Sequence, residues 1–371
     1  MSDMLGLDEL REAVRGVLAD RAPDTIHIPD ESGRGLDRKL WKDMAALGWL
    51  GLAVPEEYGG LGLGVAHLSV LYEELGAHLA SVPILETMIA VTVLTRHGDA
   101  EARARWLPAI VAGECLAAVA MPDEGGFLSI GPGNRIAGVL DHIAFADVAT
   151  LLLVPVRSAG GTALALLPAD LAGLTVTARP VVDLTRSLAR IDVNSVVPSM
   201  LSLAPADWDV MVDHAAMGIA CDAVGGAAAL LELTIKYLNV REQFGRPIGS
   251  FQALKHRAAD WKVKIDATTA LARHAAALIG ARDPGGSATA SEAKAYAVDT
   301  YAAFAGDAVQ LHGGIGFTWE HPCHLFLKRA KLSQQLYGNS IAHKDRAARC
   351  AFDQSEEAAP AATPVPQLKT A

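Results

Sequence analysis

The sequence predicts a mainly α-helical protein with a β domain in its middle. Apolar residues recur at helical spacing in the first part, short Val, Ile, Leu and Thr runs broken by turn-forming residues fill the middle, and long apolar helices return afterwards. We expect an N-terminal helical domain over residues 1–114, a middle β domain over 115–203, a C-terminal helical bundle over 204–353 and a disordered tail over 354–371. The tail is expected from its Pro/Ala-rich composition.

Spacing and turn signals define the expected elements of the first part. Leu7, Leu10 and Val14 recur at helical spacing. The segment 54–62, VPEEYGGLG, is rich in turn-forming residues and is expected to be a loop. The helices expected here cover residues 7–18, 40–48, 67–78, 84–97 and 102–112.

The middle and last parts differ in the length of their apolar runs. Short runs between Gly, Pro, Asp and Asn residues predict strands, and long Ala-rich runs predict buried helices. The expected strands cover residues 151–156, 163–167, 174–177 and 190–193. The expected helices cover residues 208–238, 251–281, 287–311, 324–336 and 340–351.

Composition excludes several classes of partner. Of the 371 residues, 51% are hydrophobic, which is enough for a large core. Acidic residues outnumber basic ones 42 to 32 without a Lys/Arg-rich block, which argues against nucleic acid or an anionic membrane as the main partner. We find no signal peptide and no run of about 18 uncharged apolar residues, so a cytoplasmic protein without a membrane span is expected.

The cysteines give no sign of a metal centre. Cys115, Cys221, Cys323 and Cys350 lie far apart and form no CxxC motif. We therefore expect buried thiols in a reducing cytoplasm and no bound metal.

Three sequence blocks carry a resemblance to a known family. The segment 237–252, YLNVREQFGRPIGSFQ, is similar to the most recognisable signature of acyl-CoA dehydrogenases. The segment 310–317, QLHGGIGF, resembles the family's other C-terminal signature, and the loop 54–62 matches an N-terminal one. Because the blocks occur in family order at family spacing, the chain up to about Phe352 is identified as a member of this family.

The resemblance implies a fold and a reaction. The family fold is an N-terminal helical domain, a β-barrel-like domain and a C-terminal four-helix bundle. Its enzymes use FAD to oxidise an acyl-CoA thioester to the trans-2-enoyl thioester. A glutamate removes the α proton, flavin N5 takes the β hydride, and electrons pass to an electron-transfer flavoprotein. Each flavin's diphosphate and adenine reach into the neighbouring subunit.

Within this family pattern, several residues suit the adenine and diphosphate end of FAD. A diphosphate needs fixed positive charge and hydrogen-bond donors, which an arginine and an amide can supply. Glycines let the backbone approach the ligand closely, and a phenyl ring can lie against flavin or adenine. The alternative is that the arginine is a surface charge and the glycines only end a helix. The candidate cofactor-binding residues are Arg241, Gln243, Phe244, Gln310, Gly313 and Gly314.

Both family positions for the catalytic base lack a carboxylate. Where most members read Tyr-Glu-Gly-Thr, this chain has Gly338, and the second location, about seven helical turns before Arg241, falls near Ala215. Removing the α proton needs a desolvated carboxylate, so no catalytic residue is expected in this chain. Asp213 is the nearest acid, but it faces about 200° away from position 215 and is expected to be a helix-surface charge. The loop that holds the flavin ring in the family also differs here. Its counterpart at 118–127, AVAMPDEGGF, lacks the family's threonine and Gly-Ser-Asp.

The residues for the adenine and diphosphate end of FAD are present, whereas the catalytic base and the flavin-ring loop are not. This pattern suggests that two unlike subunits together form one complete site. We expect the base-lacking subunit of a heteromeric acyl-CoA dehydrogenase with an α2β2 assembly, resembling the unlike-subunit pairs that act in actinobacterial breakdown of steroid side chains. The partner would carry the catalytic glutamate. Two alternatives stay open: a self-sufficient homomeric dehydrogenase with a relocated base, and a CoA-binding or scaffold homologue without a redox role.

Overall fold

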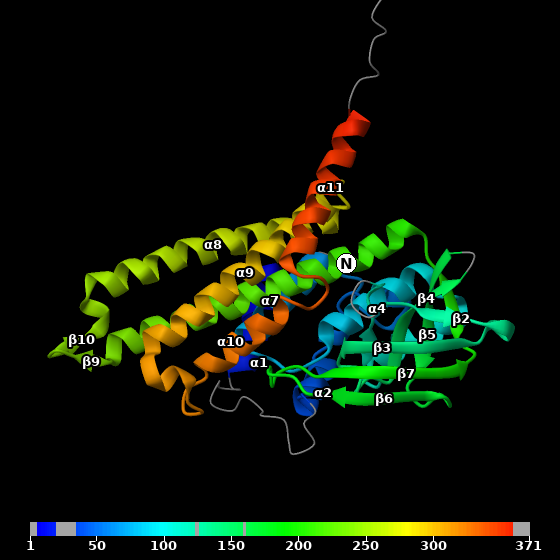
Figure 1. Ribbon diagram of the computed structural model, residues 1–371, viewed down its shortest axis with the longest axis horizontal. Helices are drawn as coiled ribbons and strands as arrows, with labels where there is room; N and C mark the ends of the chain where they lie inside the picture. The colour runs from blue at the N-terminus through cyan, green and yellow to red at the C-terminus, as the bar shows by residue number, and fades with distance from the viewer. Residues whose placement is uncertain (1–5, 20–34, 123–125, 159–160, 359–371) are drawn as a thin grey trace, which may run out of the picture.

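A computed structural model describes residues 6–19, 35–122, 126–158 and 161–358. It has the expected fold class, with helices at both ends of the chain and a sheet domain between them (Figure 1). The domain boundaries stay predictions. The N-terminal helices are α1 (Leu7–Ala19), α2 (Arg38–Ala46), α3 (Val65–Ala77), α4 (Ile84–His97) and α5 (Ala100–Val111), so every helix expected there is confirmed.

Side-chain caps fix two of these helix starts. The Asp37 carboxylate accepts a hydrogen bond from the Leu40 amide at 2.8 Å before α2, and Asp99 accepts one from the Ala102 amide at 2.7 Å before α5. Such caps satisfy amide groups that have no partner inside the helix. The predicted loop at 54–62 holds only a short 3-10 turn, η3 (Glu56–Tyr58).

The β domain is one eight-stranded sheet with its own apolar core. The strand order is β6-β7-β3-β2-β4-β5-β8, and β1 pairs with β4. All four strands expected from the sequence are confirmed as β4, β5, β6 and β7. The strands are β1 (Ala117–Val119), β2 (Leu128–Ile130), β3 (Ile136–Ala144), β4 (Leu151–Ser158), β5 (Gly161–Pro168), β6 (Leu174–Arg179), β7 (Leu188–Val196) and β8 (Ser199–Ser202).

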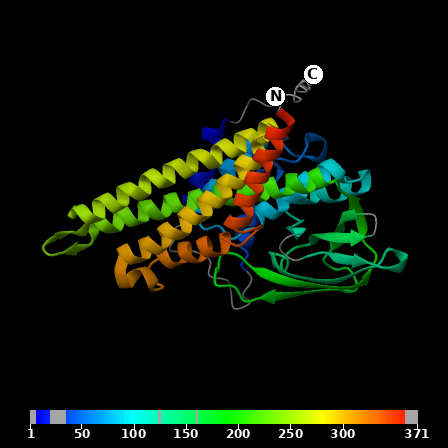
Figure 2. The ribbon, with the colours of Figure 1, turned by 45° about the horizontal axis from the view of Figure 1, so that its top comes forward.

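Three long helices form the body of the C-terminal part. They lie side by side, and a two-stranded hairpin at one end joins the first two (Figures 1 and 2). Helix α9 also contacts the two last helices. The elements are α7 (Pro205–Val240), β9 (Glu242–Gln243), β10 (Arg246–Pro247), η5 (Ile248–Ser250), α8 (Gln252–Ala281), α9 (Gly286–His312), η6 (Gly313–Phe317), α10 (Cys323–Ser333) and α11 (Ser340–Ala358).

Two expected boundaries in this part are wrong. Helix α10 ends at Ser333 rather than at residue 336, because the chain turns towards Gly338, which has a φ of +90°. Helix α11 continues to Ala358 rather than ending at residue 351 as expected, since no Pro or Gly interrupts the sequence before Pro360. The rest of the predicted tail, 359–371, lies outside the described residues.

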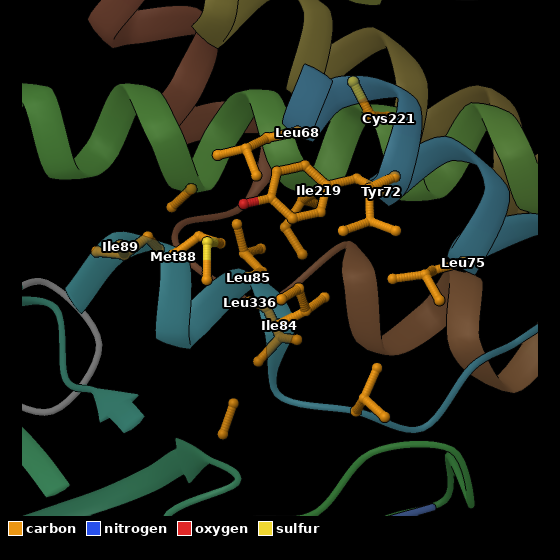
Figure 3. Packing of buried hydrophobic residues seen from close by; sticks show 14 of the residues in the cluster. Leu68, Tyr72, Leu75, Ile84, Leu85, Met88, Ile89, Ile219, Cys221 and Leu336 are labelled. Atoms are coloured by element: carbon orange, nitrogen blue, oxygen red, sulfur yellow. The ribbon is translucent and has the colours of Figure 1, made fainter. Parts of the chain in front are cut away.

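Helix α7 is long and apolar enough to cross a membrane by length and composition alone. The sequence expectation concerned uncharged runs, and it holds for this helix, because Asp213, Asp222 and Glu232 leave no run of about 18 uncharged residues in it. The apolar 18-residue window of α7 is 72% buried inside the protein, as in a core helix. Figure 3 shows why: Leu68 and Tyr72 from α3 and Leu85 and Met88 from α4 pack around Ile219 of α7.

A buried ion network joins the three parts of the chain. The Asp222 carboxylate of α7 binds the guanidinium of Arg186, which precedes β7, at 3.0 Å and that of Arg329 in α10. Arg329 also donates to the Ala80 carbonyl of the N-terminal part at 2.9 Å. Burial opposes charge on Asp222, but the two guanidinium groups outweigh it and lower the pKa of that carboxyl.

Helices α3 and α7 touch through backbone at Gly225. A Cβ atom at Gly225 would lie 1.9 Å from the Glu73 carbonyl oxygen, so no side chain fits without separating the helices. We expect Gly225→Ala to lower the free energy of unfolding by about 1–3 kcal/mol or more. The matched control is Gly16→Ala on the exposed face of α1, where nothing lies within 4 Å and a gain of about 0.5–1 kcal/mol is expected. Urea unfolding measures the free energy of unfolding of both variants. An unchanged or higher value for Gly225→Ala would contradict this close packing.

Candidate functional site

The first predicted block forms an exposed hairpin at the end of the bundle. Arg241 ends α7, Gln243 lies in β9, and Phe244 occupies the turn with a φ of +55°. The Phe244 side chain is 92% exposed, and Arg241 and Gln243 are exposed as well. The Gln243 amide donates to the Glu242 carbonyl at 2.7 Å. An exposed phenyl ring beside a guanidinium is typical of a surface that contacts a ligand or another chain.

The second predicted block lies at the same end of the bundle. Gln310 is exposed in the last turn of α9, and Gly313 and Gly314 follow in η6, where an added Cβ would meet nothing within 4 Å. The two blocks are connected through Tyr237, one turn before Arg241, whose ring centroid lies 4.6 Å from that of His312. The fold therefore brings all six predicted cofactor-binding residues to one end of the molecule.

This donor set suits one end of a dinucleotide cofactor. A guanidinium, side-chain amides and open glycine backbone can bind phosphate oxygens, and an exposed phenyl ring can cover an aromatic base. These groups face outwards, and the hairpin lies at the opposite end of the molecule from the sheet (Figures 1 and 2). A cofactor that touched both the hairpin and a sheet would therefore need the sheet of another chain. Part of the predicted ring loop, 123–125, lies outside the described residues.

The first base position, Gly338, lies next to the imidazole of His343 and the ammonium of Lys294. Its φ is +90°, and an added Cβ would lie 3.2 Å from Nε2 of His343. The fully buried ammonium of Lys294 donates to the Gly338 carbonyl. A cavity of about 220 Å³ opens beside Gly338. The carboxylate in the lining of this cavity belongs to Asp345, which is solvent-exposed rather than desolvated. The cavity is lined by Met121, Val212, Tyr337, Gly338, Ala342, His343, Asp345, Arg346 and Arg349.

The second base position also carries no acid, and its neighbours are engaged. Ala215 is fully buried. The expectation that Asp213 is a surface charge is wrong: it is 9% exposed, pairs with Arg346 at 2.7 Å and accepts a hydrogen bond from Ser287 at 2.6 Å. Burial raises the pKa of Asp213 against the effects of those partners. The Asp213 carboxylate thus serves an internal ion pair.

His214, which lies between Asp213 and Ala215 in the sequence, is a packed, neutral residue. His214 is hydrogen-bonded to the Tyr72 hydroxyl at 2.9 Å and to the Thr92 hydroxyl at 3.1 Å. Burial lowers the pKa of His214 to about 4, which keeps the ring uncharged at neutral pH.

Sequence reasoning missed one buried acid near the first base position. Glu86 of α4 is 3% exposed and accepts a hydrogen bond from the Tyr337 hydroxyl at 2.7 Å, and burial raises the pKa of Glu86. A desolvated acid of this kind can act as a base when substrate reaches it. However, the adjoining cavity, which Glu86 lines together with Tyr72 and Gly218, holds only about 30 Å³. That volume admits about one water molecule rather than an acyl chain.

Comparison with known proteins places these features in a family. Residues 7–114 match the family described as "Acyl-CoA dehydrogenase, N-terminal domain", and residues 209–352 match "Acyl-CoA dehydrogenase, C-terminal domain". The chain is 34% identical over 334 residues to acyl-CoA dehydrogenase IpdE2 of Mycolicibacterium smegmatis, which covers 89% of this chain and 93% of that protein.

Two solved structures of paired proteins are also similar. A variant of the Tcur3481–Tcur3483 steroid ACAD has a TM-score of 0.84 at 29% identity, covering 94% of this chain and 98% of that chain. The ChsE4–ChsE5 complex from Mycobacterium tuberculosis has a TM-score of 0.82 at 26% identity, covering 96% of this chain and 98% of that chain.

The two acidic partners of Arg346 allow a matched test of the internal ion pair. Asp213 is buried, whereas the side chain of Asp209, 3.0 Å from the same guanidinium, is 60% exposed. We expect Asp213→Asn to lower the free energy of unfolding by about 1–3 kcal/mol, because it leaves a buried charge less well compensated. Asp209→Asn should cost less than about 1 kcal/mol. Urea unfolding of both variants decides, and an equal or reversed order would rule out the structural role of Asp213.

Proposed function

The chain belongs to the acyl-CoA dehydrogenase family, and on that premise we propose that it is the base-lacking subunit of a heteromeric, FAD-dependent acyl-CoA dehydrogenase. The observation that carries the proposal is the separation of the two ends: the hairpin and η6 face outwards at one end, and the sheet lies at the other. The hairpin end of this chain would contact an FAD molecule that is bound mainly by an unlike partner subunit.

In this proposal the chain binds and orients the adenine and diphosphate half of FAD. The Arg241 guanidinium supplies fixed positive charge in a geometry suited to two phosphate oxygens. Gln243 and Gln310 donate from their amides, and the open backbone at Gly313 and Gly314 allows close approach. Phe244 offers a ring face that is otherwise exposed to water. When bound, FAD accepts the hydride from the β carbon of the acyl thioester.

The catalytic base would come from the partner subunit. Gly338 and Ala215 occupy the two positions where the family places its glutamate, and neither side chain can take a proton. The nearby Asp213 carboxylate is paired with Arg346. These residues support a chain that contributes nothing to α-proton removal.

The alternative of a self-sufficient enzyme with a relocated base is favoured by one observation, the buried carboxyl of Glu86 with its raised pKa. Its weakness is space, since a thioester would have to open the cavity of about 30 Å³ beside Glu86. A scaffold without a redox role would leave the exposed hairpin residues without a ligand, and no described contact favours it.

Similarity also suggests the substrate class and the setting. Because relatives include a steroid ACAD and a two-protein complex, we infer a CoA thioester with a steroid-derived acyl group and an α2β2 assembly in the cytoplasm. Electrons would leave to an electron-transfer flavoprotein, as in the family. The partner's acyl pocket would select the acyl group.

Two arginines of the same hairpin test the proposed FAD contact in the complex with the partner. Arg241→Ala should remove a charge-assisted contact of about 1.5–3 kcal/mol, which corresponds to roughly 10- to 150-fold weaker FAD binding. Arg246→Ala is the matched control, because the Arg246 guanidinium lies 4.2 Å from the Phe251 ring centroid and should leave FAD affinity nearly unchanged. FAD retained after dialysis, measured by absorbance, is the readout.

Circular dichroism and size-exclusion chromatography must show that both variants keep their fold and assembly. Equal FAD retention by the Arg241→Ala complex and the unaltered complex would mean that Arg241 is not a cofactor contact.

A further inference from the structure

Three side chains with metal-binding atoms meet where α9 gives way to α10. His312 ends α9, His321 lies in the connecting loop, and Cys323 begins α10. One ligand atom from each of the three residues lies within 4.8 Å of the others. No bound metal is expected from the sequence, and the spacing of these residues, H-x8-H-x-C, is not a common metal motif.

The hydrogen bonds of His312 leave one nitrogen available. Its Nδ1 lies 2.7 Å from the Ala308 carbonyl oxygen, which can only accept, so Nδ1 carries the proton and Nε2 keeps its lone pair. The His312 side chain is 3% exposed, and Nε2 has no hydrogen-bond partner within the described part of the chain. A buried imidazole nitrogen without a partner is unfavourable unless something binds it.

The other two residues complete a set of ligands. Nδ1 of His321 accepts a long, 3.3 Å hydrogen bond from the Cys323 amide, so its lone pair faces the start of α10, and cation binding through Nδ1 would replace this hydrogen bond. The Cys323 side chain is fully buried. The Ala308 carbonyl that holds His312 is the kind of outer contact that orients a metal-bound histidine.

We propose that His312, His321 and Cys323 form a binding site for a divalent zinc-type cation. Two imidazoles and one thiolate suit Zn²⁺, and a water molecule or another donor would take the fourth tetrahedral position. Ligand atoms around such an ion lie about 3.3–3.6 Å apart, so the present cluster must close by about 1 Å through side-chain rotation. Binding displaces the Cys323 thiol proton to solvent, so the affinity should rise with pH.

The position of the site gives it a structural consequence. A cation at these three side chains would tie the end of α9 to the start of α10, across η6. Of the three glycines in η6, it would thereby hold the backbone at Gly313 and Gly314 in one conformation. Cation binding itself depends only on the three ligands and does not rest on the proposed function.

Zinc titration of the full-length, tag-free and chelator-treated chain tests the site. We expect about one Zn²⁺ bound per chain, measured by equilibrium dialysis with elemental analysis, and a thiolate-to-metal absorption band when Co²⁺ replaces Zn²⁺. Cys323→Ser and His321→Asn should each weaken Zn²⁺ binding at least about tenfold, and Cys323→Ser should remove the band. The controls are Cys350→Ser and His256→Asn, which remove a cysteine and an exposed histidine elsewhere.

Three outcomes would overturn the proposal: no saturable Zn²⁺ binding, binding that survives both ligand variants, or binding that the two control variants weaken equally. If Cys323→Ser does not fold, as judged by circular dichroism, His321→Asn decides alone, because His321 is only partly buried and its loss should be tolerated.

Discussion

The buried Asp222 carboxylate is the contact on which the arrangement of the molecule depends. It lies on the longest helix and binds Arg186 from the sheet domain and Arg329 from α10, and Arg329 in turn reaches the carbonyl of Ala80. Removing one member would leave uncompensated buried charge, which is far more costly than losing a surface pair. The network therefore fixes the sheet against the helices, with the hairpin at the opposite end of the bundle.

This fixed arrangement fits the proposal that the chain serves only the adenine and diphosphate half of an FAD site. Arg241 and Phe244 are exposed in the hairpin, which lies at the opposite end of the molecule from the chain's own sheet, so in the proposed function their use depends on a neighbouring chain. Neither Gly338 nor Ala215 carries a carboxylate, and the Lys294 ammonium binds the backbone carbonyl of Gly338. A subunit freed from proton removal can replace a reactive carboxylate by internal contacts without loss to the assembly.

The fold could be predicted from the sequence because helices and strands follow local periodicity and turn signals. Contacts between distant residues could not: Asp213 reads as a surface acid until α9 and α11 bring Ser287 and Arg346 against it. The same holds for Glu86, whose partner Tyr337 lies 251 positions away. The end of α11 was missed because the Pro/Ala-rich composition of the chain beyond it suggested disorder, although no helix-breaking residue occurs in this helix before position 360. The candidate cofactor-binding residues were predicted only because the family pattern fixes their positions, and their role stays a prediction.

The flavin content of the chain, purified alone and together with its unlike partner, tests the central claim most directly. Absorbance spectra of both preparations, with protein determined independently, give the ratio of FAD to chain. The account predicts a nearly colourless chain alone and about one FAD for each pair of unlike subunits in an active complex. One tightly bound FAD per chain in the isolated protein, with dehydrogenase activity on acyl-CoA thioesters, would contradict it.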